Sequence, residues 1–200
     1  MKVRDIIQAI EEFAPLSIQE GWDNSGLCIG SPDDEVSSVL FGLDCTPGLV
    51  DEAVSCGADM IVTHHPLIFS GLKKISADNP TGEAVIKAIR AGISIYAAHT
   101  NADKVMAGVS GAMAARLSLK DVQILDQDGD GTGLGVVGNL PEPMTAEEAA
   151  AYVKERFNLK GLKASRAVDG MISRIAMCGG SGGSLIGGGY EVRRSALYKR

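Results

Sequence analysis

Apolar residues recur along the first hundred positions in two patterns, one with a helical period and one typical of buried strands. The first pattern predicts a helix over residues 3–13, which Pro15 ends. Strands are predicted at 36–43, 60–62 and 93–98, and the intervening segments predict helices that end at Gly57 and Gly92. Connections of this length return a chain in the same direction, so the β-α-β-α-β pattern predicts a parallel sheet.

The rest of the chain predicts a second, smaller α/β lobe. A helix rich in small residues is expected at 108–119, and strands are expected at 122–125, 162–167 and 172–178. Thr145 and Glu148 have the spacing of a capping box that opens a helix to about Phe157. We therefore divide the α/β chain into a metal-binding lobe at 1–121, an incomplete second lobe at 122–186 and a tail at 187–200.

Ligand-type side chains follow each of the three predicted parallel strands. Asp44 ends the first, His64 and His65 end the second, and His99 and Asp103 follow the third. Sites in open α/β sheets form at the carboxyl ends of strands, so these residues predict a metal site. Imidazole and carboxylate ligands suit Zn, Mn, Fe, Co or Ni without distinguishing them. His99 could be a ligand, a proton shuttle or a residue that orients the ligands, and we favour the last role.

Composition narrows the partners. The 200 residues carry a formal net charge of −6, and no run of Lys and Arg is long enough to bind nucleic acid or a membrane surface. No apolar run approaches the ~20 residues that span a bilayer, and the first residues do not form a signal peptide. The four cysteines lack CxxC spacing and read as reduced thiols, so we expect a cytoplasmic protein.

Three glycine- or aspartate-rich stretches imitate known motifs. Residues 126–131 begin like a calcium loop, but Val137 stands where a bidentate Glu is required, so we reject calcium. Residues 133–138 match GxGxxG without the strand and helix that a dinucleotide site needs, so we interpret them as a glycine-bearing strand or turn. Residues 179–184 would form an anion-binding nest only if a helix followed, and that context is incomplete. We interpret the loop 21–27, which holds Trp22, as a packed loop with a direct role left open.

Five motifs taken together are more specific. They are, in chain order, Trp22-Asp-Asn-Ser-Gly-Leu27, Val62-Thr-His-His-Pro66, His99-Thr-Asn-Ala-Asp103, Gly133-Leu-Gly135 and Cys178-Gly-Gly-Ser-Gly-Gly183. The chain resembles the Nif-three-like dinuclear-metal-centre family, also called GTP cyclohydrolase 1 type 2 homologues, over residues 1 to about 186.

The resemblance carries several implications. It implies a sandwich of two related α/β lobes, a ring-shaped homo-hexamer and up to two divalent metals per chain. It also implies that His64, His65 and Asp103 are metal ligands. The expected function is that of a metal-dependent hydrolase which activates water against a nucleotide or another small molecule. The alternatives are a non-catalytic metal-binding scaffold or regulatory protein, and an α/β domain whose histidines only pack.

The chain also departs from the family pattern. Members carry a distal His-x-x-x-Glu pair, whereas His64, His65 and His99 are the only histidines here. The last fourteen residues hold four basic residues and one acid, and they look foreign to the family. We therefore expect a C-terminal truncation, a poorly packed tail beside an exposed sheet edge, and weak binding of at most one metal.

Overall fold

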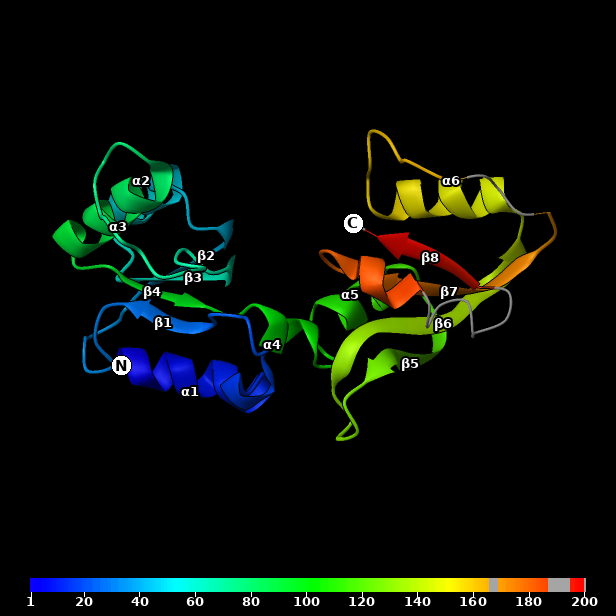
Figure 1. The fold of residues 1–200 in the computed structure, drawn as a ribbon, viewed down its shortest axis with the longest axis horizontal. Coiled ribbons are helices and arrows are strands. Elements are labelled where there is room, and N and C mark those ends of the chain that lie inside the picture. Colours follow the sequence, from blue (N-terminus) through cyan, green and yellow to red (C-terminus); the bar gives the residue numbers. More distant parts are fainter. Residues whose placement is uncertain (166–168, 187–194, 200) are drawn as a thin grey trace. The chain divides into compact units, whose positions relative to one another are not determined.

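The chain folds into two compact units, Met1–Ala102 and Asp103–Arg200, each built on one four-stranded sheet (Figure 1). The computed structural model describes residues 1–165, 169–186 and 195–199. Both units combine helices with a sheet, which confirms the α/β fold class. The predicted boundary after residue 121 falls inside the second unit, within β5 (Lys120–Gln127).

The first sheet has the strand order β1-β4-β3-β2. Its strands are β1 (Gly26–Ile29), β2 (Val39–Asp44), β3 (Met60–His65) and β4 (Ser94–Ala97). β3 lies parallel to both β2 and β4, as the β-α-β-α-β pattern predicted. The short β1 was not predicted, and it pairs antiparallel with β4. The carboxyl ends of β2, β3 and β4 therefore meet at one edge.

Helices α2 (Pro47–Cys56) and α3 (Pro80–Ala91) connect the parallel strands. The side chains of Thr46 and Asn79 cap them by accepting hydrogen bonds from backbone N–H groups three residues later, at 3.1 and 2.9 Å. Gly57 and Gly92 end them with φ of 69° and 68°, a left-handed conformation that glycine adopts without steric cost. Each connection thus has a defined start and a sharp end.

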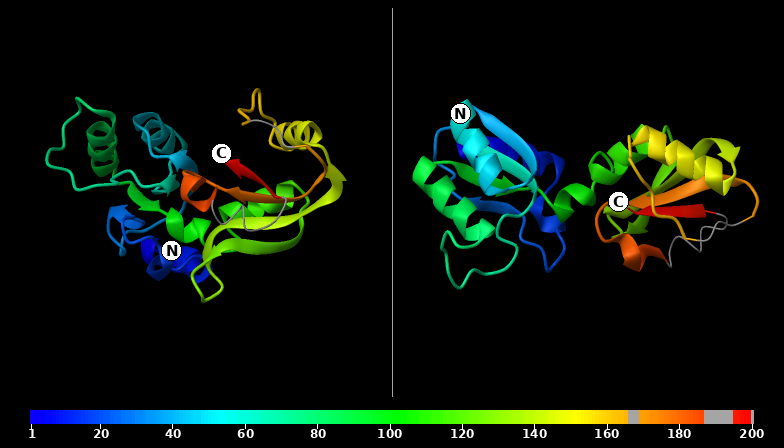
Figure 2. Two further views of the ribbon diagram at one scale, coloured as in Figure 1. Left: turned by 45° about the vertical axis from the view of Figure 1, so that its right-hand side comes forward. Right: turned by 90° about the horizontal axis from the view of Figure 1, so that it is seen from above.

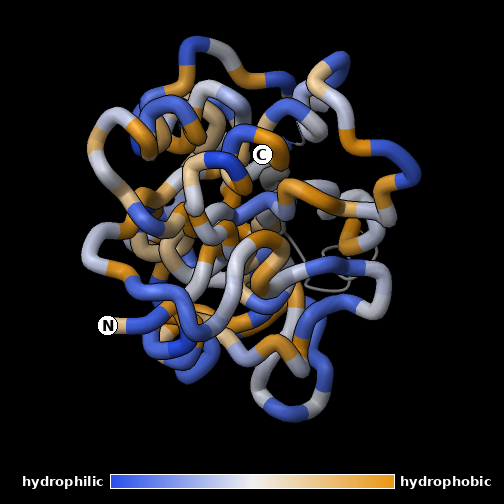
Figure 3. The backbone as a smooth tube through the Cα atoms, turned by 90° about the vertical axis from the view of Figure 1, so that its left-hand side faces the viewer, coloured by the Kyte–Doolittle hydropathy of each residue, from blue (hydrophilic) through white to orange (hydrophobic). Residues whose placement is uncertain are grey.

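The first core has two layers, because α1 (Val3–Phe13) covers one face of the first sheet and α2 and α3 cover the other (Figures 1 and 2). Met60 and Val62 face helix α1, where Tyr96 is fully buried. Ile61 faces the opposite side, which α2 and α3 cover with small and aliphatic residues. Figure 3 shows polar and apolar residues mixed along the N-terminal stretch, as expected for a helix with one buried face. The 3-10 turn η1 (Leu16–Ile18) follows α1.

The second sheet has the order β5-β6-β7-β8, with β6 (Gly133–Met144), β7 (Ile172–Cys178) and β8 (Ser195–Lys199). Its pairs are antiparallel except β7–β8. Helices α5 (Val109–Arg116) and α6 (Ala146–Arg156) bury apolar residues in one core cluster with β6 and β7. The predicted capping box is confirmed, because Thr145 and Glu148 exchange side-chain-to-backbone hydrogen bonds at 2.8 and 3.2 Å.

Two expectations for the C-terminal part need correction. Residues 162–165 form no strand, and positions 166–167 of that prediction lie outside the described residues. Residues 195–199 were expected to be poorly packed beside an exposed edge, but β8 pairs with β7 along its length. Residues 187–194 and 200 of the predicted tail lie outside the described residues. The glycine-rich stretch after β7 enters the short 3-10 turn η2 (Gly182–Leu185), and the residues from 187 on, which were expected to be non-helical, lie outside the described residues up to 194.

Candidate metal centre

The chain's three histidines meet at the carboxyl edge of the first sheet. His64 and His65 end β3, and His99 follows β4, the parallel neighbour of β3. Each residue offers one ligand atom, and these atoms all lie within 4.8 Å of one another. Their ring centroids are 5.0, 5.1 and 5.7 Å apart. The expected ligand set was His64, His65 and Asp103, and the structure brings His64 and His65 together with His99.

Each imidazole is oriented through its Nδ1 atom. Nδ1 of His64 lies 2.9 Å from the Ala98 carbonyl oxygen. Nδ1 of His65 lies 2.6 Å from Oδ1 of Asp44, and Nδ1 of His99 lies 2.7 Å from Oδ1 of Asp23. A carbonyl or carboxylate oxygen can only accept, so Nδ1 donates in all three pairs and Nε2 carries the lone pair of the neutral ring. Metal-binding histidines use this arrangement.

The His99–Asp23 pair is buried. The Asp23 side chain is fully buried and that of His99 is 17% exposed. Burial alone would raise the pKa of Asp23, but hydrogen bonds from Thr100 and His99 outweigh it and lower the pKa to about 2. Asp23 also accepts from the backbone N–H of Asn24 at 2.7 Å and from the Ser25 hydroxyl at 3.0 Å. The carboxylate therefore remains charged and fixes the ring of His99.

The His65–Asp44 pair has the same chemistry in a more open setting. The two residues stand opposite each other in the β2–β3 register. Their side chains are 46% and 60% exposed, so water can reach both. Asp44 was predicted at the end of the first parallel strand, and the structure places it against His65. Two carboxylates beside three neutral imidazoles make this edge of the sheet attractive to a cation.

Sequence reasoning did not identify Asp23 as a partner of the site. It lies 76 residues before His99, in the loop that we interpreted as a packed loop around Trp22. The signal was present in the motif Trp22-Asp-Asn-Ser-Gly-Leu27, but only the fold shows which histidine the carboxylate meets. Asp103 ends helix α4 (Thr100–Asp103) and opens the second unit, and its assignment as a metal ligand stays a prediction from the resemblance.

Two aromatic side chains lie beside the histidines. The rings of Trp22 and Phe69 are 6.0 Å apart and tilted by 50°. Each lies 6.3 Å from the His99 ring in an edge-on arrangement, at 73° and 83°. The Asn24 side-chain amide donates to the Ile68 carbonyl at 2.6 Å and so joins the two loops that carry the aromatic rings. Two aromatic side chains therefore lie at the edge of the cluster of three histidines.

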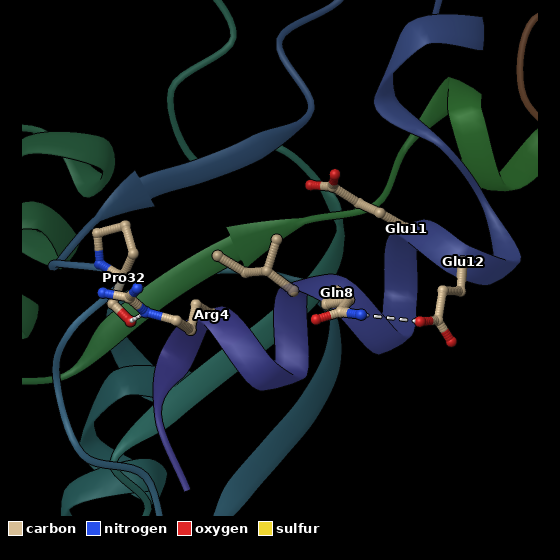
Figure 4. A pocket seen from close by; sticks show the side chains of 6 residues that line it. Arg4, Gln8, Glu11, Glu12 and Pro32 are labelled. Atoms are coloured by element: carbon tan, nitrogen blue, oxygen red, sulfur yellow. Dashed lines mark hydrogen bonds between the residues drawn. The ribbon is translucent and has the colours of Figure 1, made fainter.

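A shallow hollow elsewhere on the first unit carries no comparable chemistry (Figure 4). It is lined by Arg4, Ile7, Gln8, Glu11, Glu12 and Pro32, along α1. Gln8 donates to Glu12 at 3.0 Å and Arg4 donates to the Pro32 carbonyl at 3.4 Å, so these polar groups already have partners.

The described helices include none that is both long and apolar enough to cross a membrane.

Solved structures share this fold. A crystal structure of a Staphylococcus aureus protein matches with a TM-score of 0.93 and 30% identity, and the match covers 100% of this chain and 78% of that one. A Bacillus cereus protein described as related to NIF3 matches with a TM-score of 0.92 at 24% identity, covering 100% of this chain and 82% of that chain. The second likeness concerns the fold alone.

Curated relatives extend the likeness to sequence. A protein of Clostridium acetobutylicum named "GTP cyclohydrolase 1 type 2 homolog" is 37% identical over 185 residues, which are 91% of this chain and 69% of that protein. A Streptomyces coelicolor protein of the same name is 39% identical over 190 residues, 92% of this chain and 67% of that protein. The family profile described as Duf34/NIF3 (NGG1p interacting factor 3) matches residues 1–191. The chain belongs to the Duf34/NIF3 family.

Proposed function

We propose that this chain is a metal-dependent hydrolase whose divalent ion is held by His64, His65 and His99. The observation that supports the proposal most is the shared orientation of the three rings. All three Nδ1 atoms donate to oxygens that cannot donate back, and one ligand atom of each ring lies within 4.8 Å of the other two. Catalytic zinc sites commonly use three protein ligands and keep one position for water.

The ion, when bound, would lower the pKa of a water molecule and polarise the bond to be hydrolysed. The protein's own residues supply the rest. Asp23 keeps the His99 ring in one tautomer, and its burial prevents water from replacing it. Asp44 does the same for His65 but remains 60% exposed. This second carboxylate is therefore the candidate to accept a proton from the site and pass it to solvent.

A second metal belongs to the proposal through the resemblance. We propose Asp103 as a ligand on that ground, with neither metal identity nor occupancy specified. The substrate is proposed to be a nucleotide or a related small molecule, since relatives in two bacteria carry the name "GTP cyclohydrolase 1 type 2 homolog". Self-association into a hexamer likewise rests on the resemblance.

The experiment has two parts. Metal-free protein is titrated with Zn²⁺ or Mn²⁺ by calorimetry, and the loaded protein is then assayed against a panel of nucleotides and phosphoesters. We expect His64→Ala to abolish both tight metal binding and turnover. Cys56→Ser is the control, because this exposed thiol is a soft ligand on α2 outside the histidine cluster. Tight binding that survives His64→Ala, or that is lost in Cys56→Ser, would refute the proposed site.

A non-catalytic metal-binding protein is the second candidate. The observation that favours it is the openness of the site, with His65 46% and Asp44 60% exposed. Hydrolytic sites usually exclude bulk water around the reacting groups. Tight, histidine-dependent metal binding without turnover on any substrate of the panel would support this alternative over the hydrolase.

A further inference from the structure

We propose that Trp22 and Phe69 form the subsite that binds a planar heteroaromatic ring of the ligand, such as a purine. This inference rests on the proposed function, in which a small ligand binds at the histidine cluster. It goes further by assigning two residues that would bind the ring of that ligand. Neither residue belongs to the candidate ligand set.

The first supporting observation is exposure combined with position. Trp22 is 61% and Phe69 is 52% exposed, although large aromatic residues are usually buried. Several other large apolar side chains of the first unit are exposed, among them Phe13 and Phe41. Trp22 and Phe69 differ because each has a ring contact with His99. Trp22 and Phe69 thus directly adjoin the cluster of three histidines.

The second observation is how the pair is held. Asn24 lies two residues after Trp22, and Ile68 directly precedes Phe69. The hydrogen bond from the Asn24 side chain to the Ile68 carbonyl oxygen therefore links the two loops that carry the aromatic rings. Asp23, adjacent to Trp22, is fixed by His99 and Thr100. Polar anchors therefore position both backbones while the rings stay open to solvent. An arrangement that served only to pack these rings would be expected to bury them.

The third observation is the angle between the rings. Their planes are tilted by 50° at a centroid distance of 6.0 Å, so they do not stack face to face. With more than half of each side chain exposed, aromatic surface remains for a third ring. Aromatic faces bind nucleobases by stacking, with little dependence on base identity. A ring bound there would lie next to His99 and bring its attached groups toward the histidines.

Trp22 is the chain's only tryptophan, so its fluorescence reports on this subsite alone. Metal-free protein is titrated with guanosine monophosphate, and with ribose 5-phosphate as the ligand that lacks a ring. We expect saturable quenching by the nucleotide and none by ribose 5-phosphate. Phe69→Leu keeps apolar bulk but removes the π face, and it should raise the apparent Kd by about 5-fold or more. Phe13→Leu, the same change at an exposed phenylalanine on α1, should leave it unchanged.

The outcomes separate this inference from the proposed hydrolase. Saturable quenching by the nucleotide, in unsubstituted protein that neither binds metal tightly nor turns over any substrate of the panel, would support the ring subsite while the hydrolase proposal fails. Tight metal binding and turnover, with no quenching by the nucleotide, would overturn the ring subsite and leave the hydrolase standing. Equal weakening by Phe69→Leu and Phe13→Leu, or equal quenching by ribose 5-phosphate, would also overturn it.

Discussion

Replacing Asp23 by Asn tests whether the buried carboxylate organises the site. Oδ1 of Asp23 accepts from His99 and Asn24, and Oδ2 accepts from Ser25 and from both the backbone and the hydroxyl of Thr100. Asparagine has nearly the same shape but one side of its amide donates. Whichever way the amide turns, at least one buried N–H faces another donor, and the negative charge is gone.

The magnitude follows from these contacts. A buried donor left unpaired costs about 1–3 kcal/mol, and a hydrogen bond to a charged group contributes about 1.5–3 kcal/mol. We therefore expect Asp23→Asn to lower the free energy of unfolding by about 2–4 kcal/mol. Losing a partner that orients a metal-binding histidine typically weakens metal binding about 10- to 100-fold. We expect a loss of that size in the Zn²⁺ affinity.

Asp44→Asn is the matched control, because it changes the same kind of carboxylate–imidazole contact at nearly the same distance, 2.6 against 2.7 Å. Asp44 is 60% exposed, so water can replace its interaction, and exposed ion pairs contribute about 0–1 kcal/mol. Urea unfolding gives the stability of each variant, and competition with a chelating dye gives its Zn²⁺ affinity. The reasoning is wrong if Asp44→Asn is as damaging as Asp23→Asn in both measurements.

Four further predictions concern pH, packing and assembly. Bound metal should be released on acidification, since protonated imidazole cannot bind it; a dye-based metal assay measures this. The pKa of Asp23 is depressed from 3.8 to about 2, so its stabilisation is present above pH 3.8 and lost toward pH 2; the stability gap between wild type and Asp23→Asn should narrow over that range in urea unfolding. Gly30→Ala should cost about 2–4 kcal/mol in the same assay, because φ is 102° and the new Cβ would lie 2.1 Å from the Ser94 hydroxyl oxygen. Light scattering should show self-association, as the resemblance implies.

Each of these measurements has an outcome that counts against it. Metal content that stays constant from about pH 8 to 5 would exclude histidine ligation. A stability gap that does not change with acidification would mean that Asp23 is not the group that titrates. Gly71→Ala, which meets no atom within 4 Å, should change stability by no more than about 0.5 kcal/mol, and an effect as large as that of Gly30→Ala would remove the steric explanation. A monomer at micromolar concentration would contradict the assembly.

The parallel part of the fold was readable from sequence because its signals are local. Thr46 and Gly57 mark the two ends of one connecting helix, and the continuous apolar run Met60–Val62 marks a strand buried on both faces. The rule that parallel strands end at one edge predicted that ligand-type residues after β2, β3 and β4 gather there. The partner of His99 could not be predicted from sequence, because Asp23 lies 76 residues away along the chain and no local pattern encodes that contact.

The C-terminal part was less readable for a related reason. The strand predicted at 162–167 rested on a few apolar residues, and residues 162–165 form none. β8 was missed because its five residues, Ser-Ala-Leu-Tyr-Lys, lie in a tail that was read as foreign to the family, yet backbone pairing with β7 depends on N–H and C=O groups that each of these residues has. The structure also places His99 with the other histidines, whereas spacing alone left its role open.

The hydrogen bonds at the three imidazoles join parts of the chain that are 21, 34 and 76 residues apart. The unfolded chain has no such arrangement, so an ion that binds these imidazoles would bind only the folded first unit and raise its free energy of unfolding. At a free metal concentration 100 times the Kd, this linkage would add about 2.7 kcal/mol to the stability of the folded form. The free metal concentration would then influence the stability of the folded first unit, as well as any chemistry at the edge of its sheet.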